Sequence, residues 1–305
     1  RSRWSPTLSE LACNPLPERP GVTITSQARP VTDPAAYGER DFVGMAAVVL
    51  VAADGVRLDA VAHRPQGRPV GTVIQAHGIT ADKDEGGMFV RLADQLSATG
   101  FTVLRFSYRG HGASGGSPRG MTIAGELLDL QAAVEHAQGE YAQPLSIVAA
   151  SFGAVSTALS LPYLEDRLAG LVLWNPVLDL RATFVEPELP WGLDNFSPAQ
   201  QALLRTQGYL KVDGEFELGR VLFDEFSLYE PLAAFTASSV PTLVIHGDAD
   251  TYVSYDIARA AAAAHRNAQL HTVVGSDHGF DTRDRENEAI AVTVKWLVHR
   301  CEMWK

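Results

Sequence analysis

The chain of 305 residues contains little cysteine, and this scarcity excludes two ways of stabilising a fold. Its only two cysteines, Cys13 and Cys301, stand near opposite ends of the sequence. Two thiols so far apart form neither a disulfide framework nor a CxxC metal site. The fold must therefore depend on a hydrophobic core.

Basic clusters and long apolar runs are also missing. The 25 basic and 36 acidic residues give a formal net charge of −11, and no cluster of Lys and Arg is present, which excludes a nucleic-acid partner. The longest apolar run, residues 45–53, is too short to span a membrane, and the opening RSRWSPTLSE lacks the apolar core of a signal peptide. We expect a cytoplasmic protein without a membrane span, and a homodimer is left open.

Metal and cofactor motifs are likewise lacking. The sequence has no HExxH, no Cys/His cluster and no EF-hand loop. Its glycine pairs, Gly86-Gly87 and Gly115-Gly116, do not have the spacing of a phosphate-binding loop between a strand and a helix. We therefore expect neither a metal nor a nucleotide cofactor.

What the sequence does contain is a regular alternation of strands and helices after an irregular start. Residues 1–42 carry six prolines and no sustained period, which predicts an irregular N-terminal arm. Residues 43–305 are predicted to form one α/β domain with a mainly parallel central sheet flanked by helices. The predicted strands are 45–53, 56–62, 72–77, 102–107, 145–150, 169–174, 241–246 and 269–274. The predicted helices are 87–99, 121–138, 152–162, 255–266 and 284–300.

One connection is too long for a plain crossover. Residues 177–238 are rich in Phe, Trp, Leu and Pro, and this composition predicts an inserted helical lid. Four of its aromatic residues are candidates for lining a substrate cleft: Phe184, Trp191, Phe196 and Tyr209. Such a lining suits apolar or aromatic groups.

The segment AASFGAV places Ser151 directly after the predicted strand 145–150 and before a predicted helix. A serine on such a turn projects from the carboxyl edge of the sheet, provided that the residues two before and two after it are small. Ala149 and Gly153 meet this condition, although glycine is usual at the first position. The pattern makes Ser151 a candidate nucleophile.

Two further side chains follow buried strands at the same edge. Asp250 follows strand 241–246, and His278 follows strand 269–274. A serine hydroxyl needs an imidazole to accept its proton, and the imidazole needs a carboxylate to orient it. The order Ser151, Asp250, His278 supplies all three roles, with Asp248 and Asp277 as alternative acids.

Two backbone N–H groups are candidates for an oxyanion hole. One belongs to Ile79, in HGIT after strand 72–77, and the other to Phe152, at the start of the helix after Ser151. His77 and His246 end buried strands, and we expect them to bond loop backbone. Arg109 and His111 are expected to brace the loop after strand 102–107.

The segments HGIT (77–80), RFSYRGHGASGG (105–116), MTIAGELLDL (121–130), HGDADTYVS (246–254) and GSDHGF (275–280) together resemble the α/β-hydrolase family. Within it, residues 45–300 are most similar to bacterial cinnamoyl or feruloyl esterases and to serine hydrolases of the S9 and S33 groups. The resemblance implies an α/β-hydrolase fold with Asp250 as the acid and His278 as the base. The alanine before the serine also resembles the acyl-ACP thioesterase or transferase of bacterial bioluminescence.

These observations predict a serine hydrolase that cleaves carboxylic esters with an apolar or aromatic acyl group through an acyl-enzyme intermediate. An acyl thioesterase or acyltransferase of fatty-acid or natural-product metabolism is the alternative. A non-catalytic ligand-binding member of the fold is a further one. In the first two cases the partner is a small-molecule ester or thioester.

Overall fold

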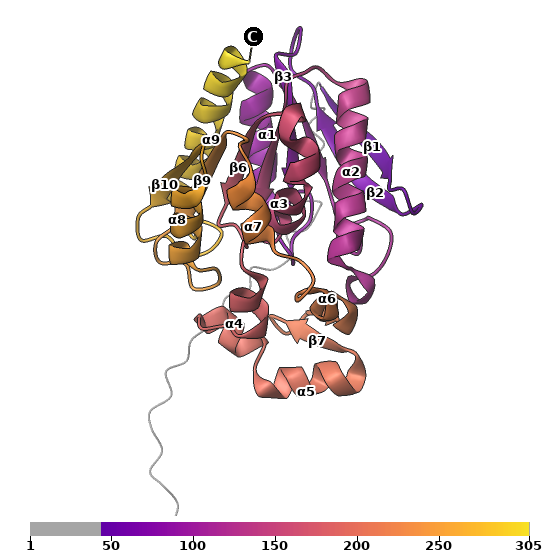
Figure 1. The fold of residues 1–305 in the computed structure, drawn as a ribbon. Coiled ribbons are helices and arrows are strands. Elements are labelled where there is room, and N and C mark those ends of the chain that lie inside the picture. The colour runs from indigo at the N-terminus through magenta and orange to yellow at the C-terminus, as the bar shows by residue number, and fades with distance from the viewer. Residues whose placement is uncertain (1–43, 305) are drawn as a thin grey trace, which may run out of the picture. The chain divides into compact units, whose positions relative to one another are not determined.

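An eight-stranded sheet forms the centre of the part of the chain that the structure describes. The computed structural model describes residues 44–304, so the predicted arm, 1–42, lies outside the described residues. The strand order is β1-β2-β4-β3-β5-β6-β9-β10 (Figure 1). The strands are β1 (Met45–Val51), β2 (Arg57–His63), β3 (Gly71–Ala76), β4 (Phe101–Phe106), β5 (Leu145–Ala150), β6 (Leu168–Trp174), β9 (Thr242–Gly247) and β10 (Ala268–Val273).

The sheet is mainly parallel, as its sequence pattern predicts. β2 pairs antiparallel with both β1 and β4, and all other neighbours pair parallel. Every residue of β3, β4, β5, β6 and β9 is buried, because helices cover both faces of these strands. Their continuous apolar runs are the consequence.

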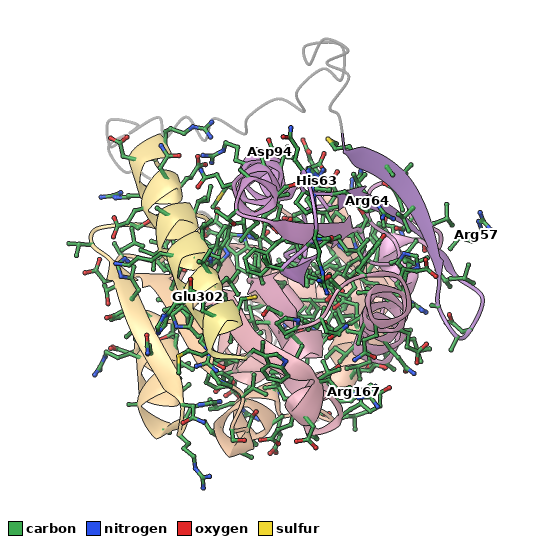
Figure 2. The ribbon with its side chains drawn as sticks, turned by 90° about the horizontal axis from the view of Figure 1, so that it is seen from above. Arg57, His63, Arg64, Asp94, Arg167 and Glu302 are labelled. Atoms are coloured by element: carbon green, nitrogen blue, oxygen red, sulfur yellow. The ribbon has the colours of Figure 1, made fainter. Side chains whose placement is uncertain are left out.

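Helices form a layer on each face of the sheet. One layer consists of α1 (Met88–Ala98) and α9 (Arg283–Met303), which carry the labelled Asp94 and Glu302 in Figure 2. The other layer consists of α2 (Ile123–Glu140), α3 (Gly153–Leu164), α7 (Pro231–Ala237) and α8 (Tyr255–Ala264). Alternate residues of β5 contribute to the two cores, with Ile147 facing the second layer and Val148 the first.

The predicted elements differ from the observed ones by a few residues at their ends. The segment 121–138, for example, is helical from Ile123 because the Thr122 hydroxyl accepts the Gly125 N–H at 2.9 Å and caps the helix. No helix within residues 44–304 is both long and apolar enough to cross a membrane.

The long connection after β6 forms a separate small unit at one end of the sheet (Figure 1). We call residues 177–230 the insertion. It contains a π-helical turn (Arg181–Val185), α4 (Pro190–Asn195), α5 (Pro198–Gln207), β7 (Tyr209–Val212), β8 (Phe216–Gly219) and α6 (Arg220–Glu225).

The insertion differs from the predicted helical lid in two ways. β7 and β8 form an antiparallel hairpin around Asp213 and Gly214, both of which have positive φ. The end of the predicted lid forms α7, which packs beside α3, with Phe235 buried in the core between the sheet and its helices. Because α7 covers the sheet, the insertion ends near residue 230 and not at 238.

Candidate active site

Ser151 occupies a strained turn between β5 and α3. Its φ is +49°, which is rare for a residue with a side chain, and its N–H donates to the Trp174 carbonyl at 2.8 Å. A Cβ on Gly153 would lie 2.5 Å from the His77 carbonyl oxygen, so only glycine is accommodated there. The Ala149 methyl packs into the core, which accounts for alanine at a position where glycine is usual.

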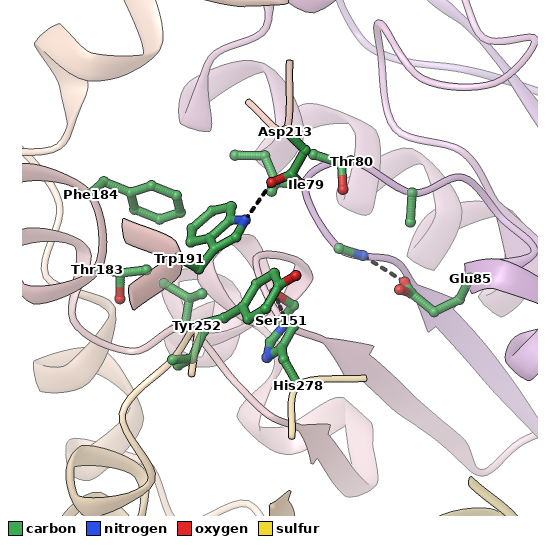
Figure 3. A pocket seen from close by; sticks show the side chains of 14 residues that line it. Ile79, Thr80, Glu85, Ser151, Thr183, Phe184, Trp191, Asp213, Tyr252 and His278 are labelled. Carbon is green, nitrogen blue, oxygen red and sulfur yellow. Dashed lines mark hydrogen bonds between the residues drawn. The ribbon is translucent and has the colours of Figure 1, made fainter. Parts of the chain in front are cut away.

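A chain of hydrogen bonds starts at this serine. The Ser151 hydroxyl lies 3.1 Å from His278 Nε2 (Figure 3). His278 Nδ1 lies 2.8 Å from Asp250 Oδ2. The other Asp250 oxygen, Oδ1, accepts the N–H groups of Tyr252 and Val253, both at 2.8 Å. The structure thus brings together three side chains that are up to 127 positions apart in the sequence. In this arrangement the imidazole can take the serine proton while the carboxylate stabilises the resulting cation.

The two alternative acids are engaged elsewhere. Asp248 accepts the Gly275 N–H at 2.5 Å. Asp277 accepts the Thr251 N–H at 2.7 Å and the backbone N–H of His278 at 2.8 Å. Neither carboxylate bonds the imidazole of His278, so Asp250 is the acid that the structure places beside it.

Electrostatics favour an ionised Asp250 next to a basic His278. Burial alone raises the pKa of Asp250, but the neighbouring rings of His278 and His246 hold it below its usual range. Burial alone lowers the pKa of His278, but the carboxylates of Asp250, Glu85 and Asp277 raise it above the ordinary value. The imidazole therefore has the proton affinity that a general base needs.

His246 has a larger part than sequence reasoning gave it. It bonds loop backbone as expected, with Nε2 3.2 Å from the Val253 carbonyl oxygen. The same Nε2 also lies 3.1 Å from Asp250 Oδ2, so this carboxylate oxygen accepts from two imidazoles. Because the HGDAD spacing also suits a purely structural histidine, only the fold reveals this contact.

The N–H groups of Ile79 and Phe152 have no hydrogen-bond acceptor within residues 44–304. The Gly78 carbonyl oxygen accepts from His77 Nδ1 at 2.7 Å, which fixes the peptide between Gly78 and Ile79. Because this peptide is trans, the Ile79 N–H points away from that carbonyl. His111 Nε2 holds the Ile79 carbonyl at 2.5 Å.

Arg109 braces the loop after β4, as expected. Its guanidinium donates to Asp129 from Nη2 at 2.8 Å and to Asp54 from Nη1 at 2.7 Å. The backbone N–H of Arg109 also donates to Asp129 at 2.8 Å. This loop carries His111, so the ion pairs also fix the side chain that holds Ile79.

A cavity of about 90 Å³ opens beside Ser151. Phe184 and Trp191 line it, as predicted, together with Ile79, Val177 and Val253. Its polar lining includes the carboxyl groups of Glu85 and Asp213 and the ring of Tyr252 (Figure 3).

Phe196 and Tyr209 do not line this cavity, and the prediction that they do is wrong. Phe196 is buried behind Phe184, against which its ring packs at 5.3 Å between centroids. Tyr209 lies under the guanidinium of Arg119, 3.6 Å from the ring centroid. Composition alone could not separate the aromatic residues that pack the insertion from those that face the cavity.

Glu85 and Tyr252 are site residues that sequence reasoning did not single out. Glu85 Oε2 accepts the Gly78 N–H at 2.7 Å, and burial raises the pKa of Glu85 to about 7, against the opposing effects of this bond and of His278. The Tyr252 ring stacks on His278 with 4.8 Å between centroids. Tyr252 stands inside HGDADTYVS, the segment that contains Asp250, and Glu85 lies five residues after HGIT, the segment that contains Ile79. Within residues 44–304 no group of three or more His, Cys, Asp or Glu is arranged to hold a metal ion.

The sheet topology, the helical layers and the serine turn define an α/β-hydrolase fold. A family model described as serine aminopeptidase, S33, matches residues 67–220, just over half of the chain. The chain belongs to this family of hydrolases. No curated protein matches it.

Solved structures of esterases share the fold. Est1E from Butyrivibrio proteoclasticus, with ferulic acid bound, has a TM-score of 0.71 and 20% identity, over 83% of this chain and 99% of that one. The esterase domain of a Rhodothermus marinus protein has a TM-score of 0.63 and 19% identity, over 83% and 97%. A Pyrococcus furiosus esterase has a TM-score of 0.65 and 21% identity, over 84% and 91%. At these identities the similarity establishes the fold alone.

Proposed function

We propose that this hydrolase is a serine esterase that acts through an acyl-enzyme intermediate. The observation that carries the proposal is the hydrogen-bonded chain from Ser151 through His278 to Asp250, with distances of 3.1 and 2.8 Å. Ser151 attacks the ester carbonyl while His278 Nε2 takes its proton. His278 then returns the proton to the leaving alcohol, and water attacks the acyl-enzyme with the same base.

The N–H groups of Ile79 and Phe152 stabilise the oxyanion. Both lack an acceptor within the described residues, and both adjoin Ser151 or the cavity beside it. His77 fixes the peptide that contains the Ile79 N–H, and His111 fixes the following peptide, so this donor is oriented before the substrate binds. Removal of one such donor from comparable enzymes lowers the rate about 10² to 10³-fold.

The acyl group is apolar or aromatic. Phe184, Trp191 and Val177 supply an apolar wall, and the insertion serves as a lid because it contributes these side chains next to Ser151. The carboxyl groups of Glu85 and Asp213, which also line the cavity, disfavour a negatively charged acyl group. The bound ferulic acid of Est1E, which has the same fold, also supports an aromatic acyl group.

Covalent labelling tests the nucleophile. A fluorophosphonate is expected to label the protein and to lose this reaction completely in Ser151→Ala. Ser160→Ala, which changes a serine on α3 that donates to the Ser156 carbonyl, is the control and retains labelling. Labelling of Ser151→Ala at the rate of the unaltered protein would refute the proposal, and absence of labelling in both would favour a ligand-binding protein.

A substrate panel then separates ester hydrolysis from the alternative. Hydrolysis rates are compared for methyl ferulate and for acyl thioesters of increasing chain length. We expect the aryl ester to react faster, because the aromatic side chains of Phe184 and Trp191 line the cavity beside Ser151. Faster turnover of long-chain thioesters, or transfer of the acyl group to an added alcohol or amine in preference to water, would instead indicate a thioesterase or acyltransferase.

A further inference from the structure

Three aromatic rings form a continuous stack that ends on the imidazole beside Ser151. The ring of Tyr252 is parallel to that of His278, with 8° between the planes and 4.8 Å between centroids. The indole of Trp191, from the insertion, stacks on Tyr252 with 16° between the planes and 5.0 Å between centroids. Figure 3 shows Tyr252 between the other two rings.

We infer that Tyr252 is a positioning residue that holds the His278 ring in plane and stabilises its cationic form through the face of the phenol ring. This role rests on the proposed serine-esterase mechanism, in which the imidazole gains a proton as Ser151 attacks. The face of an aromatic ring carries negative charge density and attracts a cation placed over it. Nothing in the proposed reaction makes Tyr252 bond the substrate.

The backbone of Tyr252 strengthens this assignment. Its N–H donates to Asp250 Oδ1 at 2.8 Å, while its ring covers His278, so one residue contacts both the acid and the base. Rotation of the imidazole out of plane would break the bond to Ser151 and also displace the phenol ring. The phenol cannot yield easily, because Trp191 backs its other face. The Trp191 backbone N–H donates to the Thr251 carbonyl at 3.2 Å, and its indole N–H donates to Asp213 Oδ1 at 2.9 Å.

The charged groups that face His278 come from three loops. Asp250 follows β9, Glu85 follows β3 and Asp277 precedes His278 itself, and all three carboxylates raise the pKa of the imidazole. The ring of Tyr252 therefore adds to the stabilisation of the imidazolium by these carboxylates and is not its only source. Its hydroxyl has no hydrogen-bond partner in the described part of the chain, so the ring and not the hydroxyl is the expected source of the effect.

The test compares Tyr252→Leu, which removes the ring, with Tyr252→Phe, which keeps it. The rate of fluorophosphonate labelling of Ser151 is measured against pH, so no natural substrate is needed. In the leucine variant we expect the midpoint of the acid limb to fall by about half to one pH unit and the plateau rate to fall about threefold to thirtyfold. In the phenylalanine variant we expect the midpoint of the unaltered protein.

Tyr163→Leu is the matched control, because Tyr163 is exposed on α3 and lies outside the cavity lining. Circular dichroism checks that each variant is folded, and Tyr252→Met replaces the leucine variant if that one is not. A leucine variant with an unmoved or raised midpoint would overturn the inference, as would an equal fall for phenylalanine. Absence of labelling in the unaltered protein would instead overturn the proposed function itself.

Discussion

Replacement of Glu85 by glutamine should stabilise the folded protein at neutral and alkaline pH. The side chain is partly buried between the Gly78 N–H, which it accepts at 2.7 Å, and the cavity beside Ser151. Burial raises the pKa of Glu85 from 4.5 to about 7. Glutamine has the same shape and keeps an oxygen for the Gly78 N–H, but it cannot ionise. The substitution therefore removes the charge and leaves the hydrogen bond.

The magnitude follows from the two pKa values of Glu85. Between pH 4.5 and about 7 the unfolded chain has released this proton and the folded chain still holds it, so the free energy of unfolding decreases as the pH rises. A difference of one pKa unit corresponds to about 1.4 kcal/mol, which gives a total loss of about 3 kcal/mol. Below pH 4.5 both states are protonated and the loss is absent.

Equilibrium unfolding in urea at pH 5 and at pH 8 measures this loss. The free energy of unfolding of Glu85→Gln is expected to be higher than that of the unaltered protein by about 3 kcal/mol at pH 8. At pH 5 the difference should be less than about 1 kcal/mol. Glu302→Gln, an exposed carboxyl on α9, is the control and should give no pH-dependent difference. Equal stability of Glu85→Gln and the unaltered protein at pH 8 would refute the argument that burial opposes the charge of Glu85.

Three other substitutions test separate parts of the structure. Asp250→Asn should lower kcat for a reactive aryl ester about 10⁴-fold, because an amide neither fixes the imidazole tautomer nor stabilises its cation; a loss below tenfold would contradict this role. Arg109→Ala should lower the free energy of unfolding by about 3 to 5 kcal/mol, because it leaves the fully buried Asp129 carboxylate without its cation. Denaturant titrations measure this loss. Arg181→Ala, which breaks an exposed ion pair, is the control and should show a much smaller loss. Gly153→Ala should abolish fluorophosphonate labelling, because the added Cβ would lie 2.5 Å from the His77 carbonyl oxygen; labelling at the original rate would show that the turn can relax.

Local patterns in the sequence were sufficient for the sheet and for the helices that cover it, except α7, which was predicted as part of the lid. Strands such as β5 are continuous apolar runs, and every residue of β5 is buried. α2 repeats apolar residues at helical spacing and begins after a threonine cap. These signals are local because they depend on which residues can be buried together within one element.

The insertion was less accessible to such reasoning. Its aromatic residues indicated that their side chains are buried, but not whether each side chain faces the cavity. Phe196 and Tyr209 were therefore expected at the cavity although they pack elsewhere. The β7–β8 hairpin turns at Asp213 and Gly214, which have left-handed conformations; the prediction of a helical lid rested on composition and did not use this Asp-Gly turn. The orientation of each side chain in a packed aromatic cluster depends on neighbours that are distant in the sequence.

For the candidate site, the sequence by itself determined which residue types stand at the carboxyl ends of parallel strands, and hence the candidates Ser151, Asp250 and His278. Strand order and the lengths of the loops after β9 and β10 decided that Asp250, and neither Asp248 nor Asp277, lies beside the imidazole. The contacts of Glu85, His246 and Tyr252 with this group arise only from tertiary packing. The physical reason is that a one-dimensional pattern records burial and spacing, whereas hydrogen bonds, ring stacking and pKa depend on distances across the folded chain.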